Sequence, residues 1–179
     1  MSAAAAFIVW FGAALLVLSE GRRALALGMA LITVGFAVLA LAGVGALAAT
    51  AILVGGGFAA TRRLRSGPDV WGIMPSGSTA RVVLAVAVGL VALWVSTSVT
   101  TGPGAPLRFA ALSVLGLMVA RILTPSEPPA VVTALAAIAV SVAATAGVAG
   151  TSPGPAVYVL AAMVAVGVSL VPVREVHGA

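Results

Sequence analysis

The stretch "ATRRLRSGPDVWGIMPSGSTARVV" (residues 60–83) is the one long polar interruption in an otherwise apolar chain. It holds four of the nine arginines and the single aspartate, Asp69. The chain has 179 residues, of which 62% are hydrophobic and only 7% charged, whereas soluble domains carry about 25% charged residues. So little charge leaves most of the surface to contact lipid. Because a lipid-exposed backbone must satisfy its own hydrogen bonds, the sequence predicts an all-α integral membrane protein.

On either side of this interruption the chain divides into apolar runs near the length that crosses a bilayer, about 17–25 residues. The predicted spans of this single transmembrane domain, residues 1–179, are 3–19, 24–42, 46–61, 82–100, 107–123, 129–148 and 156–173. Gly43 and Gly45 favour a tight turn between the second and third spans. A single bent segment there would leave six spans. We expect the first run to be a retained span, since it lacks the basic start of a signal peptide.

The arginines orient the predicted bundle. With seven spans and the N-terminus outside, eight of them fall on the inner side and only Arg108 falls on the outer side. The inner arginines are Arg22, Arg23, Arg62, Arg63, Arg65, Arg81, Arg121 and Arg174. This is the split that the positive-inside rule describes, and six spans would spoil it. The sequence therefore predicts an outside N-terminus, a cytoplasmic loop over 62–81 and a cytoplasmic C-terminus. Arg108 and Arg121 lie near the ends of the fifth span, where long side chains can snorkel to the interface.

The residue inventory excludes several kinds of chemistry. There is no cysteine and only one histidine, His177, so thiolate chemistry and multi-histidine metal or haem sites have no ligands. All four acidic residues fall in inner-side segments, which argues against proton coupling through a carboxylate in the membrane. The absence of lysine excludes a retinal Schiff base. We therefore predict no catalytic, cofactor-binding or metal-binding residues, and no enzyme activity. The net charge of +5 follows from membrane orientation, and we predict no nucleic-acid partner.

Three groups of residues are candidates for binding or packing. Candidate partner or phosphate contacts are Arg62, Arg63, Arg65, Trp71, Ser76, Ser78, Thr79 and Arg81. A candidate polar pocket consists of Ser96, Thr97, Ser98, Thr100 and Thr101. A small-residue ladder for close helix packing consists of Ala51, Gly55 and Ala59. Two simpler interpretations stay open: the arginines set topology alone, and the hydroxyl groups bond back to their own helix.

Seven spans divide as three, one and three, and the two triplets then run in the same direction. "SEGRRALALGMAL" (residues 19–31) and "SEPPAVVTALAAI" (residues 126–138) each follow the first span of a triplet. Parallel triplets of this kind occur as internal repeats in some transporters. The arrangement is therefore a candidate duplication.

The leading functional hypothesis is a non-catalytic accessory, assembly or scaffold subunit of a larger membrane complex. The alternative is a small-solute or lipid transporter that acts as a homo-oligomer. A membrane enzyme with lipid substrates is a third class, disfavoured by the missing catalytic residues. The expected partners are the lipid bilayer and other membrane subunits or further copies of the chain. The composition, rich in Ala, Val, Gly and Arg and free of Lys and Asn, suggests a GC-rich bacterial genome and a multi-pass protein of the bacterial plasma membrane.

Overall fold

The computed structural model describes residues 2–65, 79–99, 104–123, 128–146 and 155–170. Within these ranges the chain is all α-helical, without a β-strand. The α-helices are α1 (Ser2–Leu18), α2 (Arg22–Gly43), α3 (Ala46–Leu64), α4 (Thr79–Trp94), α5 (Ala105–Leu123), α6 (Pro128–Ala146) and α7 (Pro155–Ser169), and η1 (Val95–Val99) is a π-helical turn that continues α4. Each predicted apolar run corresponds to one of these α-helices. The largest displacement of an end is in the fourth run, where α4 ends at Trp94 and η1 continues to Val99.

Local sequence explains where the helices begin and end. Pro128 and Pro155 are the first residues of α6 and α7, where the missing N–H has no intrahelical partner to lose. Gly45 separates α2 from α3 with a φ of 125°, a left-handed conformation that favours glycine. The second and third runs are therefore two helices, and the alternative of one bent segment is wrong. The expected loop over 62–81 is shorter than predicted, because α3 continues to Leu64 and α4 begins at Thr79.

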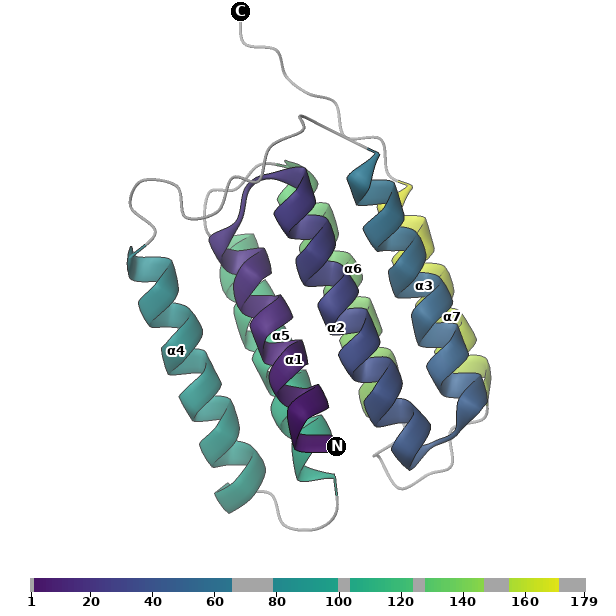
Figure 1. Ribbon diagram of the computed structural model, residues 1–179, viewed down its shortest axis with the longest axis horizontal. Coiled ribbons are helices and arrows are strands. Elements are labelled where there is room, and N and C mark those ends of the chain that lie inside the picture. Colours follow the sequence, from purple (N-terminus) through teal and green to yellow (C-terminus); the bar gives the residue numbers. More distant parts are fainter. Residues whose placement is uncertain (1, 66–78, 100–103, 124–127, 147–154, 171–179) are drawn as a thin grey trace, which may run out of the picture.

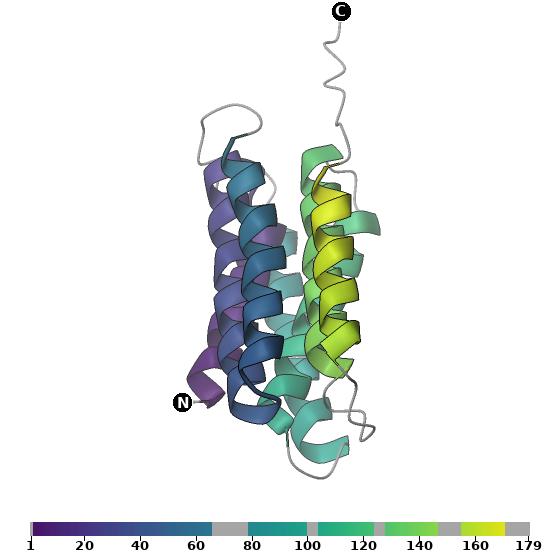
Figure 2. The same ribbon diagram turned by 90° about the vertical axis from the view of Figure 1, so that its right-hand side faces the viewer.

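Six of the helices form two layers. One layer contains α1, α2 and α3, the other contains α5, α6 and α7, and α1, α2 and α3 lie opposite α5, α6 and α7 respectively (Figures 1 and 2). Helix α4 lies outside these layers and packs only along their edge, on α1 and α5 (Figure 1). The described helices thus divide in space as three, one and three. The two matched motifs do not pack alike, however: Gly28 is buried against α1, whereas Leu135 at the matching position is exposed.

Glycines let the helix backbones approach closely. A Cβ atom on Gly12 would lie 2.8 Å from the carbonyl oxygen of Gly28, and one on Gly28 would lie equally close to the carbonyl oxygen of Gly12. The contact between α1 and α2 is therefore reciprocal and involves backbone on both sides. Lipid gives helices no hydrophobic reason to associate, so van der Waals contact of this kind supplies much of the packing energy in a membrane bundle.

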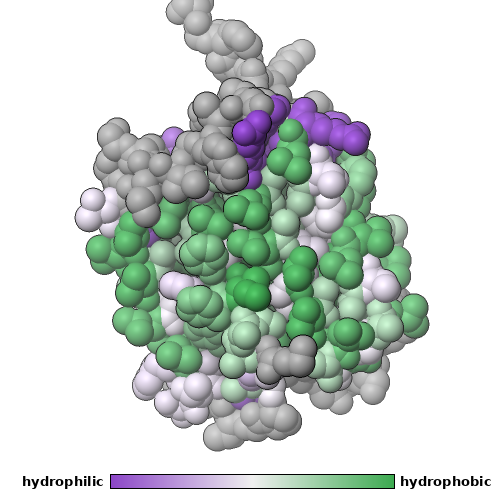
Figure 3. Space-filling model, in the orientation of Figure 1, coloured by the Kyte–Doolittle hydropathy of each residue, from purple (hydrophilic) through white to green (hydrophobic). Residues whose placement is uncertain are grey.

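The described arginines gather at one end of the molecule. Arg22 begins α2, Arg62 and Arg63 lie in the last turn of α3, Arg81 lies in the first turns of α4, and Arg121 lies in the last turn of α5. These helix ends are all at the top of Figure 1, and Figure 3 shows hydrophilic residues gathered there above a mostly hydrophobic face. Of the arginines that the structure describes, only Arg108 lies at the opposite end, where α5 begins.

Three helical segments are long and apolar enough to cross a membrane: Arg22–Gly43, Thr79–Ser98 and Ala105–Leu123. Among them, Thr79–Ser98, which is α4 with most of η1, is the least buried inside the molecule. Shorter apolar helical segments lie within α1, α6 and α7: Ser2–Leu18, Ala130–Thr145 and Val157–Ser169. The described chain is thus all-α with membrane-compatible helices.

Candidate functional site

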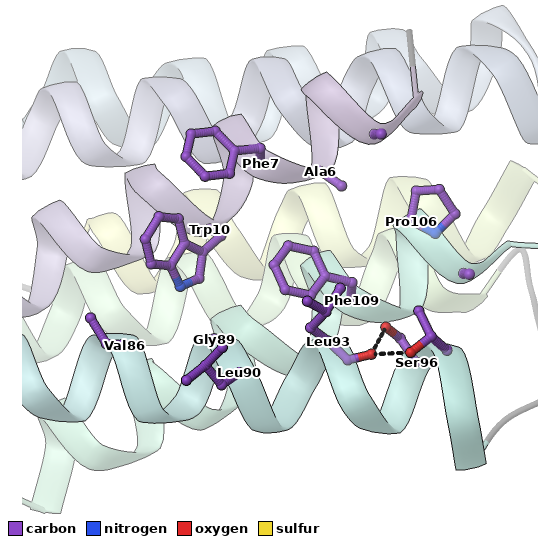
Figure 4. Close-up of a pocket in the computed structure, with 13 residues that line it drawn as sticks. Ala6, Phe7, Trp10, Val86, Gly89, Leu90, Leu93, Ser96, Pro106 and Phe109 are labelled. Carbon is purple, nitrogen blue, oxygen red and sulfur yellow. Dashed lines mark hydrogen bonds between the residues drawn. The ribbon is translucent and has the colours of Figure 1, made fainter.

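A lateral pocket of about 520 Å³ lies between α1, α4 and α5. Small-molecule sites commonly enclose about 300–1,000 Å³. The lining residues are Ala3, Ala6, Phe7, Trp10, Val86, Gly89, Leu90, Leu93, Ser96, Thr97, Ala105, Pro106 and Phe109. Among these residues only Ser96 and Thr97 carry hydroxyl groups, and Trp10 carries an indole N–H. The other lining residues have apolar side chains or, at Gly89, no side chain. We refer to this space as the lateral pocket; Figure 4 shows it from the side.

Trp10 determines the spacing between α1 and α4 at the lateral pocket. Its indole Nε1–H donates a hydrogen bond of 3.3 Å to the carbonyl oxygen of Ala85, and its ring packs against Phe7 with a centroid distance of 5.2 Å. On the α4 side it lies over Gly89, where a Cβ atom would overlap the indole ring (Figure 4). Because Gly89 has no side chain, the indole ring of Trp10 fits against α4. The ring in turn holds α1 and α4 apart along the pocket.

Two residues of the candidate polar pocket, Ser96 and Thr97, line one end of the lateral pocket. Ser96 and Thr97 belong to the π-helical turn, and both hydroxyl groups donate to the carbonyl oxygen of Leu93, at 3.0 and 2.8 Å (Figure 4). Ser96 is buried, whereas Thr97 and Ser98 are exposed. The hydroxyl bonds of Ser96 and Thr97 go to their own helix, as is common for Ser and Thr in membrane helices. Thr100 and Thr101 lie outside the described residues.

The described candidate phosphate or partner contacts lie at two different helix ends, the end of α3 and the start of α4. Arg62 and Arg63 lie in the last turn of α3 and Arg65 follows it, where cations interact favourably with the helix dipole. Thr79 is the first residue of α4. Arg81 forms an ion pair with Glu20, with 2.8 Å between Nη1 and Oε1, which ties the start of α4 to the connection after α1. The remaining candidates, Trp71, Ser76 and Ser78, lie outside the described residues.

Arg121 lies inside the bundle and does not use the snorkelling that its position near a span end allows. The side chain is only 1% exposed. Its two terminal nitrogens donate to the carbonyl oxygens of Val17, at 3.1 Å, and Ser19, at 3.0 Å. These carbonyls lie at the C-terminal end of α1, where the last carbonyls have no partner within their helix. Arg121 therefore caps a helix of the opposite layer with a forked cation, a role that its position near a span end does not reveal.

The predicted small-residue ladder lies on α3. Gly55 faces α7, where a Cβ atom would come within 2.8 Å of the Cα atom of Ala162. Ala59 is buried and Ala51 is partly exposed. The neighbouring Gly56 faces Thr33 of α2, while nothing lies within 4 Å of a Cβ atom on Gly57. Of the three consecutive glycines, Gly55 lies at the interface with α7, Gly56 lies at the interface with α2, and Gly57 faces open space.

The lateral pocket itself was not foreseen from the sequence. Its lining comes from segments about one hundred residues apart in the chain, Ala3 to Phe109, and consists of residue types that occur throughout the chain. Among the described residues there is no group of three or more His, Cys, Asp or Glu side chains that would hold a metal ion. This arrangement can bind apolar groups by van der Waals contact.

Comparisons with protein-family models, with curated proteins and with solved structures find no match to this chain.

Proposed function

We propose that the protein is an integral membrane protein whose seven helices all span a bacterial plasma membrane, with the N-terminus outside and the C-terminus in the cytoplasm. The supporting observation is the distribution of charge over an apolar bundle. Seven of the eight arginines that the structure describes lie at one end and only Arg108 lies at the other. Positive residues flanking spans favour the cytoplasmic side. The exposed surface between the two ends is largely apolar (Figure 3), which suits contact with lipid.

Reporter fusions test this topology. Fusions after Gly67 and Gly178 are expected to report a cytoplasmic location, and a fusion after Gly102 is expected to report the outside. The measurement uses a reporter pair in which one member is active only in the cytoplasm and the other only outside it. An outside signal at Gly67 or Gly178 would overturn the seven-span topology.

We further propose that the protein performs no catalysis and acts as an accessory, assembly or scaffold subunit of a larger membrane complex. The observation that carries this proposal is how three of the buried polar side chains are used. Thr33 donates to the carbonyl oxygen of Met29 at 2.7 Å, and Ser141 faces the carbonyl oxygen of Ala111 at 3.5 Å. Arg121 binds the carbonyl groups at the end of α1. Polar groups that bond to helix backbone in this way support a structural role for the interior. In this proposal the outer surface is the part that contacts other subunits.

Purification from native membranes in a mild detergent tests the subunit role. A tagged chain is expected to carry at least one other membrane protein with it in fixed stoichiometry. The measurement is the protein composition of the peak from size-exclusion chromatography, identified by mass spectrometry. Elution with copies of itself alone would contradict the subunit proposal.

The lateral pocket favours a second candidate, a lipid or small-solute transporter that acts as a homo-oligomer. Its volume and apolar lining suit a hydrophobic molecule better than a hydrophilic one. A homo-oligomer as the only species in the purification above would favour this candidate.

A further inference from the structure

The lateral pocket has the length of one leaflet. Along α4 and η1 its lining extends from Val86 to Thr97, a distance of about 16 Å at roughly 1.5 Å per residue. The hydrocarbon core of a bilayer is about 30 Å thick, so the pocket extends from near mid-membrane to one membrane face. The N-terminal half of α1 and the first turns of α5 line parts of the same depth, from Ala3 to Trp10 and from Ala105 to Phe109. An elongated space of this depth fits a chain that lies along the membrane normal.

The chemistry of the lining fits a hydrocarbon. The polar groups closest to the space make hydrogen bonds to backbone: the Trp10 indole to Ala85, and the hydroxyls of Ser96 and Thr97 to Leu93. A polar solute would lose its hydration and meet aliphatic and aromatic carbon along most of the pocket. A hydrocarbon chain loses nothing by the same transfer, and gains contact with the rings of Phe7, Trp10 and Phe109.

A cation lies on α5 among the residues that line this end of the pocket. Arg108 is in the same first turns of α5 as the lining residues Pro106 and Phe109. Among the described arginines it alone lies at this end of the molecule (Figure 1). In a membrane this end of the helices is at headgroup level, where a guanidinium group matches the geometry and charge of a phosphate.

We propose that the lateral pocket binds one acyl chain of a phospholipid from the leaflet at the Arg108 end, with the phosphate of that lipid at Arg108. The inference rests on the proposed membrane location and is independent of the accessory role. The lipid enters sideways between α1 and α4, where α4 packs only along the edge of the two layers. The bound lipid extends the contact between α4 and the rest of the bundle.

Quenching of Trp10 fluorescence tests the acyl-chain position. In a Trp71→Phe/Trp94→Phe protein Trp10 is the only tryptophan, and vesicles of phosphatidylcholine brominated in its acyl chains are expected to quench it strongly. Val86→Phe fills the pocket beside Trp10 and is expected to reduce the quenching several-fold. Val91→Phe is the matched control, because Val91 lies on the same helix and is 61% exposed, against 48% for Val86, but does not line the pocket.

A second measurement separates displacement of the lipid from simple shielding of the indole ring. Native mass spectrometry of the protein extracted in mild detergent is expected to show one retained phospholipid per chain, lost in Val86→Phe and kept in Val91→Phe. Equal quenching and equal lipid retention in the two variants would overturn the acyl-chain site. This outcome would leave the topology and subunit proposals untouched, because reporter fusions and co-purification test those separately.

The phosphate contact has its own test. At equal low fractions in unlabelled phosphatidylcholine vesicles, brominated phosphatidylcholine is expected to quench Trp10 more effectively than brominated diacylglycerol. Phosphatidylcholine carries an anionic phosphate that diacylglycerol lacks, and one arginine beside that phosphate gives an expected preference of about five-fold. Arg108→Gln is expected to remove the preference while the quenching by diacylglycerol remains. The same preference in the Arg108→Gln protein would overturn the assignment of the phosphate to Arg108.

Discussion

Replacing Gly55 by leucine is expected to destabilise the bundle by about 3 kcal/mol, at the upper end of what overpacking costs in a core. Even the first atom of a side chain at this position would come within 2.8 Å of the Cα atom and 3.2 Å of the carbonyl oxygen of Ala162. Backbone atoms cannot rotate away, so α3 and α7 must separate along their contact. The measurement is the free energy of unfolding by titration with a denaturing detergent in mixed micelles.

Gly57→Leu is the matched control for this substitution. It makes the same change two residues further along α3, where nothing lies within 4 Å of the new Cβ atom. Leucine is a better helix former than glycine by roughly 0.8 kcal/mol, so the control is expected to be as stable as the original protein or slightly more stable. Similar unfolding free energies for the two variants would show that α3 does not pack on α7 through Gly55.

Replacing Arg121 by methionine is expected to cost about 1.5–3 kcal/mol, the range for hydrogen bonds that involve a charged group. The variant keeps a long side chain but leaves the carbonyl groups of Val17 and Ser19 without the donors that reach them at 3.1 and 3.0 Å. Arg121→Lys is expected to restore only part of the stability, because a lysine presents a point charge in place of a planar fork. The same detergent titration measures both variants.

Arg81→Met provides the comparison for Arg121→Met. It removes one arginine from the same end of the molecule, so any effect on membrane orientation is matched. Arg81 is 23% exposed in its ion pair with Glu20, and partly exposed pairs contribute about 0–1 kcal/mol. An Arg121→Met protein no less stable than the Arg81→Met protein would contradict the capping role of Arg121.

The sequence determined where the helices are. Long apolar runs form helices because each backbone group can then bond within its own segment, and Gly45, Pro128 and Pro155 end or begin these runs for reasons that are local to each residue. The gathering of arginines at one end also follows from the sequence, since helices joined by short connections alternate in direction. The division into three, one and three helices was a hypothesis from the sequence, and the packing of α4 outside the two layers is what gives it a spatial meaning.

Only the tertiary structure decided which side of each helix faces inward. In a soluble protein the alternation of apolar and polar residues marks the buried face, but these helices are apolar on every side, and lipid does not distinguish one apolar face from another. Gly55 and Gly57 are equivalent in the sequence, yet one lies against α7 and the other faces open space. Arg108 and Arg121 flank the same helix, yet only Arg121 reaches across to cap α1. The lateral pocket also depends on which helix faces lie against each other. It forms where the indole of Trp10 lies against Gly89 of a distant helix.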